Sequence, residues 1–277
     1  MEKITRFSLS GEKETLFITL RAKALDSRSE HSLLHDDMAY WILQSVNYDF
    51  DKYSKSNDGP MVIRARQFDE WVREYINDNR DAAVVHIGCG LDTRITRIAP
   101  PNSVSWYDLD FPEVIQIRKF FYSEKGGYRM LASSAVEDEW LAQIPANRNA
   151  LIIAEGVLEY FTFEEVKTLF NRLLVHFEKG EIIFDVMNGF AIRLGKKALR
   201  KTTGAQQKWA VNDTSIIDSI HPRLTKITEL SVTKSECIQE LPHQSQKIYK
   251  FMFLVPLFRN MLRMMRYQFI GEKHERY

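Results

Sequence analysis

Glycines and carboxylates follow several strand-like segments of this sequence, and the first such segment is typical of a ligand-binding turn. Residues 84–94 read VVHIGCGLDTR, in which four strand-like residues end at Gly88 and Gly90. The two glycines let the backbone turn tightly and approach a ligand closely, and Asp92 and Thr93 suit the start of a helix. The pattern predicts the first strand–helix turn of an α/β sheet, where ligands lie across the carboxyl ends of the strands.

The residue at position 93 bears on which ligand this turn binds. Gly88 and Gly90 match the first two glycines of a dinucleotide motif, but Thr93 stands where the third should be. That glycine lets a helix pack closely over a pyrophosphate. Its absence argues against NAD and FAD and favours S-adenosylmethionine (SAM), which has no pyrophosphate. The alternative is a glycine turn that merely ends a strand.

Two acids lie about twenty residues beyond the glycines, at the end of the next predicted strand. Asp108 and Asp110 belong to the segment WYDLDFP. An acid at this position accepts hydrogen bonds from ribose hydroxyls in dinucleotide sites, and either aspartate could do so here. Asp110 could also cap the following helix, and the two roles are compatible.

A third acid ends the segment LIIAEGVLEYF. Glu155 and Gly156 follow an apolar run, and in a doubly wound sheet this strand lies beside the first, at the topological switch point. A charge at the end of a buried strand belongs in the cleft, where Glu155 would face the ammonium group of SAM. Glu159 and Tyr160 are better explained as packing residues or cleft wall.

The elements that position these residues fall into two parts. The first eighty residues are predicted to be helical, with helices over 14–25, 37–46 and 61–76 and a loop over 52–60. From Ala82 onward strand and helix patterns alternate, as in a βαβ protein. The predicted strands are 83–87, 104–109, 128–132, 150–155 and 181–186, and Thr162 with Glu165 forms a capping-box spacing.

The last ninety residues are less regular. Residues 188–213 form a basic, partly helical insertion, and a strand (225–232), a helix (245–266) and a short strand (267–270) are predicted after it. The apolar, arginine-containing segment 251–266 could lie on a membrane surface. A helix that covers one face of the sheet has the same pattern and is the favoured interpretation.

Composition limits the remaining function classes. Lys and Arg (38) nearly balance Asp and Glu (37), so the charge gives no sign of nucleic-acid binding. The two cysteines, Cys89 and Cys237, lack the spacing of a zinc site or a disulfide framework, and no metal site is predicted. We expect no signal peptide and no membrane span, and hence a soluble, cytoplasmic protein.

Taken together, the motifs GCGLDTR, YDLDFPEV and LIIAEGVLEYFTFEE resemble the leucine carboxyl methyltransferase family, which includes the tetracenomycin-type polyketide O-methyltransferases. The resemblance runs from about Thr15 to Asp213. It implies a class I SAM-dependent methyltransferase fold: a Rossmann-like seven-stranded sheet with an antiparallel last strand. The whole chain would be one domain, divided into a helical cap (1–80), a SAM-binding core (81–187), a substrate-covering insertion (188–224) and C-terminal strands and helix (225–277).

The resemblance also assigns roles to basic residues of the cap. Arg64 would bind the carboxylate of SAM, a bidentate task that suits a guanidinium, and Arg66 is a neighbour that could be confused with it. Arg21, or Lys23 beside it, matches a basic position near the cofactor and the substrate. Each of these residues could instead lie on a solvated helix face.

In the core, the resemblance places Gly88 and Gly90 against the methionine end of SAM. Asp110 or Asp108 would bind the ribose, and Glu155 would bind the ammonium group.

The chain departs from the family pattern before Trp140. An acidic residue that contacts adenine is common there, whereas this chain has Ser134 and Ala135. A serine hydroxyl still hydrogen-bonds to an adenine amine, but less strongly than a carboxylate, so a modest affinity for SAM is expected.

The predicted function is SAM-dependent O-methylation of a carboxylate on a small molecule or peptide. A carboxylate with a pKa of about 4 is ionised at neutral pH, so no general base and no catalytic residue are predicted. A phenol acceptor would require a base, for which His221 or Tyr160 could be named without support. His86 lies within the first strand and is expected to be a packed residue.

Two other functions compete with this one: a non-catalytic binding protein on the same scaffold, and an NAD-dependent oxidoreductase. The acceptor site should be built from the cap and from residues 188–213, where Trp209, Arg193, Lys196 and Lys197 could recognise an aromatic or anionic acceptor. No oligomeric state is predicted.

Overall fold

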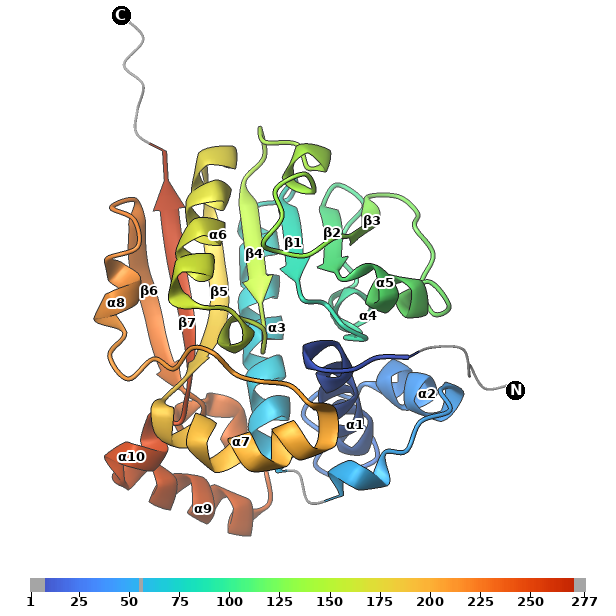
Figure 1. The fold of residues 1–277 in the computed structure, drawn as a ribbon, viewed down its shortest axis with the longest axis vertical. Helices are drawn as coiled ribbons and strands as arrows, with labels where there is room; N and C mark the ends of the chain where they lie inside the picture. The colour runs from blue at the N-terminus through green and yellow to red at the C-terminus, as the bar shows by residue number, and fades with distance from the viewer. Residues whose placement is uncertain (1–7, 55–56, 272–277) are drawn as a thin grey trace, which may run out of the picture.

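A seven-stranded sheet with helices on both faces forms the centre of the molecule (Figure 1). The computed structural model describes residues 8–54 and 57–271. The strands follow the order β3-β2-β1-β4-β5-β7-β6. Their bounds are β1 (Ala83–Ile87), β2 (Ser105–Asp110), β3 (Tyr128–Ala132), β4 (Ala150–Ala154), β5 (Lys179–Met187), β6 (Leu224–Ser231) and β7 (Leu262–Ile270).

Strands β1 to β5 are parallel, and β7 pairs antiparallel with both β5 and β6. The predicted fold class is therefore confirmed, as is the position of β4 beside β1. In this order the direction in which successive strands are added to the sheet reverses between β1 and β4. Their carboxyl ends therefore form the crevice in which α/β proteins bind ligands.

The two faces of the sheet are covered by different helices. In Figure 1, α3 (Gly59–Asp78) lies behind the sheet and α6 (Phe163–His176) lies in front of it. Strand β4 is buried along its whole length, with Ile152 in the cluster that includes α6 and Ile153 in the cluster that includes α3. Alternate side chains thus enter opposite layers, as expected for a parallel strand buried on both faces.

Three further helices and turns form a cap beyond the carboxyl edge of β1 and β2 (Figure 1). They are η1 (Glu12–Thr15), α1 (Leu16–Asp26) and α2 (Asp37–Ser45). Phe17 and Ile42 are fully buried in a core of their own with Val114 and Ile117 of α5 (Pro112–Arg118). The predicted helical start of the chain is confirmed, although Gly59 and Pro60, assigned to a loop, already open α3 because proline suits the first turn of a helix.

The remaining helices connect or flank the strands. Thr162 and Glu165 form the predicted capping box at the start of α6. The insertion contains α7, capped by the Asn188 side chain. The other elements are α4 (Arg94–Ile98), α5 (Pro112–Arg118), η2 (Asp51–Tyr53), η3 (Leu141–Gln143), η4 (Leu158–Tyr160), α7 (Gly189–Thr203), α8 (Ser215–Asp218), η5 (Val232–Lys234), η6 (Glu236–Glu240), α9 (His243–Leu254) and α10 (Pro256–Arg259).

The long helix predicted over 245–266 is wrong. Helix α9 ends at Leu254, Pro256 opens the short α10, and strand β7 begins at Leu262. Arg263 and Arg266 could be placed in this strand because each has a partner: Arg263 Nη1 donates to Glu229 and Arg266 Nε to Glu181. Pairing with two strands outweighs the helical pattern of the isolated sequence.

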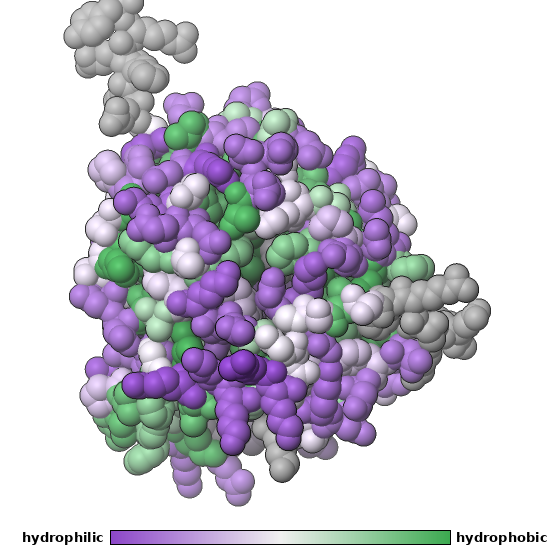
Figure 2. All heavy atoms as spheres, in the orientation of Figure 1, coloured by the Kyte–Doolittle hydropathy of each residue, from purple (hydrophilic) through white to green (hydrophobic). Residues whose placement is uncertain are grey.

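The expectation that this segment covers one face of the sheet is wrong as well. Helix α9 lies beyond the carboxyl edge of the sheet (Figure 1). It buries Tyr249 and exposes Phe251 and Leu254, and Figure 2 shows apolar side chains gathered at this lower edge. Among the described residues, no helix is both long and apolar enough to span a membrane.

Candidate functional site

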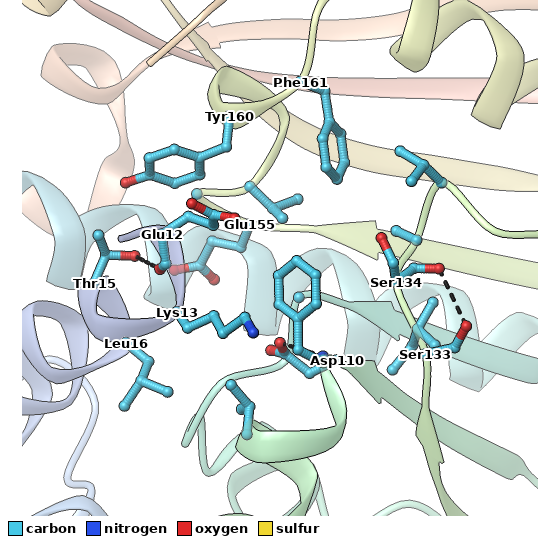
Figure 3. A pocket seen from close by; sticks show the side chains of 18 of the residues that line it. Glu12, Lys13, Thr15, Leu16, Asp110, Ser133, Ser134, Glu155, Tyr160 and Phe161 are labelled. Carbon is cyan, nitrogen blue, oxygen red and sulfur yellow. Dashed lines mark hydrogen bonds between the residues drawn. The ribbon is translucent and has the colours of Figure 1, made fainter. Parts of the chain in front are cut away.

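A cavity of about 300 Å³ lies at the carboxyl ends of four neighbouring strands (Figure 3). Its volume is in the range of small-molecule sites. Each of β1 to β4 contributes a residue at or just beyond its end, and η1 provides the opposite wall. The residues used below are Lys13, Thr15, Gly88, Asp110, Phe111, Ser134, Ala135, Glu155, Gly156, Val157 and Tyr160.

The glycine turn approaches this cavity with its backbone. Gly88 and Gly90 have φ angles of +63° and +51°, in the left-handed region that favours glycine. A Cβ on Gly88 would lie 2.6 Å from Val157 Cγ2, and one on Gly90 would lie 3.1 Å from Leu16 Cβ. Of the two, Gly88 lines the cavity. Gly90 instead donates its N–H to the Asp110 carboxylate, at 2.7 Å.

Gly88→Ala is expected to lower the free energy of unfolding by about 1–3 kcal/mol, because it combines an unfavourable φ with a clash against Val157. Urea denaturation of the folded protein measures this loss. The control is Gly195→Ala on α7, where the added methyl meets nothing within 4 Å. That control should stabilise the protein by up to about 1 kcal/mol, since alanine favours a helix. Equal stability of both variants would contradict the role given to Gly88.

The two candidate ribose acids occupy different environments. Asp110 lines the cavity, and its carboxylate accepts the backbone N–H groups of Gly90 and Phe111. Burial raises the pKa of Asp110 to about 6, against the opposing effect of these two donors. Helix α5 has Phe111 at its N-cap position and no side-chain cap, so the suggestion that Asp110 caps this helix is wrong.

Asp108 is fully buried away from the lining of the cavity. Its carboxylate accepts from Arg118 Nε at 2.8 Å, from Trp106 Nε1 at 2.9 Å and from the Tyr128 hydroxyl at 2.6 Å. Burial opposes its ionisation, but Arg118, His86 and Tyr128 together outweigh this effect and lower the pKa of Asp108 to about 2. Its contacts are those of a structural ion pair.

Glu155 is buried among three cations. Arg64 Nε donates to its Oε1 at 3.2 Å, Arg94 Nη2 donates to its Oε2, and Lys23 Nζ lies 3.7 Å from Oε1. Burial disfavours the charged form, yet Lys23, Arg94 and Arg64 together hold the pKa of this carboxyl well below its usual range. Glu155 therefore stays ionised at the edge of the cavity.

A buried ion-pair network extends from Glu155 under the glycine turn. Arg94 also donates to Asp69 at 2.7 Å, and Arg97 donates to Asp69 and to Asp36. The Thr93 hydroxyl is buried and donates to Asp36. Position 93 thus fixes the turn to the cap. The sequence pattern does not predict this network. Its only signal there is the run DTR directly after the glycines.

The basic residues of the cap are placed as follows. Arg64 is buried and donates from Nη1 to Asp185 at 2.8 Å, and a Cβ on Gly156 would lie 2.9 Å from its Nη2. Arg66 points elsewhere and pairs with Glu70. Arg21 pairs with Asp58. Lys23 is the member of the predicted Arg21–Lys23 pair that reaches Glu155.

At the end of β3 the predicted serine lies at the cavity. Ser134 and Ala135 both line it (Figure 3). Ser134 therefore faces the same space as Asp110.

A second cavity of about 500 Å³ lies between the cap and α7. It shares Thr15, Thr19, Gly156 and Tyr160 with the first cavity, so the two meet at the residues that follow β4. Its remaining lining is mostly apolar and includes Met61, Met187, Ala191, Leu194, Ala198 and Leu199, together with Lys52, Arg64 and Glu159.

The other residues considered for the acceptor lie outside this lining. Trp209 is nine-tenths buried against Phe163. Arg193, Lys196 and Lys197 form part of a shallow groove on the outer side of α7, over which Figure 2 shows strongly hydrophilic side chains. His86 is buried with Nε2 3.2 Å from Arg94 Nη1, so it is a packed residue, as expected.

The N-terminal turn and α7 are joined by their backbones. The Gly11 N–H donates to the Thr203 carbonyl at 2.8 Å, and Gly11 and Gly204 form an isolated parallel bridge. Thus η1, which walls the first cavity, is tied to the end of the helix that walls the second.

Comparisons with known proteins were made for both sequence and fold. Residues 17–174 match the family model of leucine carboxyl methyltransferase. The chain is 33% identical to the tetracenomycin polyketide synthesis O-methyltransferase TcmP of Streptomyces glaucescens, over 94% of this chain and 98% of that protein. It is 28% identical to a SAM-dependent methyltransferase, dpfgK, of Gibberella zeae, over 79% of this chain and 82% of that protein.

Solved structures share the fold at low sequence identity. A putative methyltransferase from Thermobifida fusca aligns with a TM-score of 0.62 and 12% identity, covering 96% of this chain and 97% of that one. The plantazolicin methyltransferase BamL, solved with a triazolic desmethylPZN analogue and SAH, aligns with a TM-score of 0.53 and 10% identity, covering 94% and 98%. These likenesses confirm the predicted methyltransferase fold.

Proposed function

The chain belongs to the leucine carboxyl methyltransferase family and is a SAM-dependent methyltransferase, and on this premise we propose that it methylates a carboxylate of a small molecule. The observation that carries the proposal is the meeting of two cavities at Gly156 and Tyr160. One has charged groups suited to an amino acid and a ribose, and the other is mostly apolar. A methyl donor and an acceptor placed in them would meet at the end of β4.

The residues of the first cavity fit SAM by their chemistry. Asp110 would accept hydrogen bonds from the ribose hydroxyls, and Glu155 would bind the ammonium group. Arg64 lines the second cavity and not the first, but its Nη2 lies beside Gly156, which lines both. It would bind the carboxylate through Nη2, because its Nη1 and Nε are already engaged by Asp185 and Glu155. Ser134 would bind the adenine amine. Gly88 lines the cavity and would lie against the methionine part.

SAM, when bound, supplies a methyl group activated by a positively charged sulfur. The protein's contribution to the reaction is to hold the acceptor oxygen in line with that group and to keep water out. Tyr160 and Thr15 border both cavities and would position the acceptor next to the donor. A carboxylate acceptor is ionised at neutral pH, so no side chain has to remove a proton.

Methyl esters give this proposal a specific test, because alkali releases methanol from an ester and leaves a methyl ether intact. The protein is incubated with methyl-labelled SAM and a panel of aromatic and aliphatic carboxylic acids, each paired with the phenol or alcohol of matching skeleton. We expect volatile label after alkali from the acids. Label that stays on the hydroxyl compounds would refute a carboxylate acceptor, and calorimetry with SAH shows independently whether the cofactor binds.

The affinity for SAH is expected to fall about tenfold between pH 7 and pH 5 because of Asp110. Its carboxyl has a pKa of about 6, so it is ionised at pH 7 and protonated at pH 5, where it accepts ribose hydrogen bonds less well. Asp110→Asn should remove this pH dependence and weaken binding about 10–100-fold at pH 7. Calorimetric titration across this range measures both effects. Asp78→Asn removes an exposed carboxylate at the end of α3, outside the lining of the cavity, and should leave the profile unchanged.

A further inference from the structure

Glu159 is a buried acid that the proposed reaction does not use. It lies in η4, four residues after Glu155, and lines the second cavity. Only 6% of the residue is exposed, and its Oε2 atom has no hydrogen-bond partner within residues 8–54 and 57–271. The backbone is fixed here, because the Glu159 carbonyl accepts the N–H groups of Lys208 and Trp209.

The groups around Glu159 leave its carboxyl without a dedicated cation. Arg64 is the positive charge that lowers its pKa, but this guanidinium donates to Asp185 and Glu155. Asp185 accepts from Arg64 and from the Gly156 N–H and adds a like charge. Lys52, elsewhere in the cavity wall, is paired with Glu14. Burial and the charge of Asp185 therefore raise the pKa of Glu159 to about 7, although Arg64 opposes the shift.

A buried carboxyl oxygen without a hydrogen bond destabilises a fold by about 1–3 kcal/mol, unless a ligand supplies the missing hydrogen bond. Here the orphan oxygen belongs to a residue of the acceptor cavity, one position before Tyr160, which borders both cavities. The surface of that cavity is largely apolar, with Leu194 and Leu199 from α7, although Asn57, Thr202 and Gln207 also line it. A ligand that fits has an apolar body and a hydrogen-bonding group for Glu159.

We propose that Glu159 in its neutral form donates a hydrogen bond from its carboxyl group to the carboxylate of an apolar acceptor acid, so that the acceptor enters its cavity together with one proton. The inference rests on the proposed function, since it takes the acceptor to be a carboxylate. A carboxylic acid donor to a carboxylate forms a charge-assisted hydrogen bond, which is stronger than a neutral one.

Glu159 takes up a proton when the acid binds and can release it after methyl transfer. The entering anion favours the protonated form of Glu159, so a proton is taken up from solvent on binding. Methyl transfer converts the acceptor carboxylate into an uncharged ester and moves no proton. Without the anion Glu159 is free to ionise and return its proton to solvent, and its contact with the product weakens. Acceptor acids therefore bind more tightly than their methyl esters, and the difference grows at low pH.

The test measures proton uptake rather than turnover. Protein saturated with SAH is titrated by calorimetry at pH 8 with aromatic and aliphatic monocarboxylic acids of one to three rings, and with their methyl esters. Each titration is repeated in phosphate and in Tris, whose ionisation enthalpies differ. We expect close to one proton taken up per acid bound and none per ester.

Three variants separate the role of Glu159 from a structural one. Glu159→Gln keeps a neutral donor, so it should bind the acids with normal affinity and without proton uptake. Glu159→Ala should bind them at least tenfold more weakly while its SAH affinity stays within threefold, which also shows that it is folded. Glu164→Gln removes an exposed carboxylate nearby and should behave as the parent chain.

The possible outcomes test the role of Glu159 separately from the proposed methylation of a carboxylate. If acids bind and are methylated, but without proton uptake or with the same uptake in Glu159→Gln, the inference is overturned and the proposed function stands. If SAH binds and no acid of the panel binds, both are overturned. If hydroxyl compounds alone are methylated and Glu159→Gln abolishes that activity, Glu159 is a general base and not a donor.

Discussion

Glu155→Gln is expected to bind SAH about one hundred times more weakly than the parent chain, a loss of about 3 kcal/mol. The carboxylate lines the cavity and is held ionised by Lys23, Arg94 and Arg64. Glutamine has nearly the same shape but no charge for a ligand ammonium group. Losing one partner of a buried charge pair costs several kcal/mol, because the other charge stays buried. Calorimetry with SAH at pH 7 measures the change.

The same substitution also disturbs the buried ion network, so a matched control is needed. Asp69→Asn removes a carboxylate that contacts the same Arg94, yet Asp69 does not line the cavity. Asp69→Asn should lower the free energy of unfolding about as much as Glu155→Gln does, and it should change the SAH affinity less than threefold. If both variants lose affinity equally, Glu155 acts only through the network and the assignment of the ammonium group to it is wrong.

Arg118→Met is expected to lower the free energy of unfolding by about 3–5 kcal/mol. The guanidinium is fully buried, donates to the Asp108 carboxylate, and donates from Nη1 to the carbonyls of Gly90 and Asp92. Methionine fills similar space but leaves Asp108 as an unpaired buried charge. Urea denaturation followed by circular dichroism measures the loss. A loss below about 1 kcal/mol would show that Asp108 finds another partner.

The pair also has a pH signature. The folded-state pKa of Asp108 is about 2, below its ordinary value, so the pair contributes stability above about pH 4 that disappears as the pH falls towards 2. The contribution at neutral pH is roughly 2 kcal/mol. Arg118→Met should lose this acid-dependent component. Adding Asp108→Asn to Arg118→Met should recover part of the lost stability, because it removes the isolated charge.

Much of the fold could be predicted because its signals are local. Strands β1 and β3 begin and end where the apolar pattern predicts, and the capping box of α6 is a spacing of three residues. The last four residues of β7 (267–270) are predicted as a strand and are confirmed, but its first five residues could not be found in the same way. Its arginines are compatible with a buried strand only because Glu229 and Glu181 are supplied by distant strands.

The choice between Asp108 and Asp110 shows a different limit. Residues two apart in a strand point to the same face, so periodicity cannot separate them. Their roles differ because Asp108 lies within the sheet opposite His86, where Arg118 reaches it, whereas Asp110 is the last residue of β2 and borders the cavity. Only the position of α5 resolves this.

The role of Glu159 was equally invisible in sequence. The sequence favours packing or cleft wall for this residue, and both descriptions fit a residue next to Tyr160. What sets it apart is the absence of a partner for one oxygen among the residues described. That depends on Arg64 being engaged by Asp185, a contact between residues 121 positions apart.

The backbone bond between Gly11 and Thr203 couples the walls of the two cavities. It ties η1, which borders the first cavity, to the end of α7, which borders the second. A ligand that shifted η1 would therefore also shift the end of α7. The space available in one cavity would then depend on how the other is filled, apart from any contact between the two ligands.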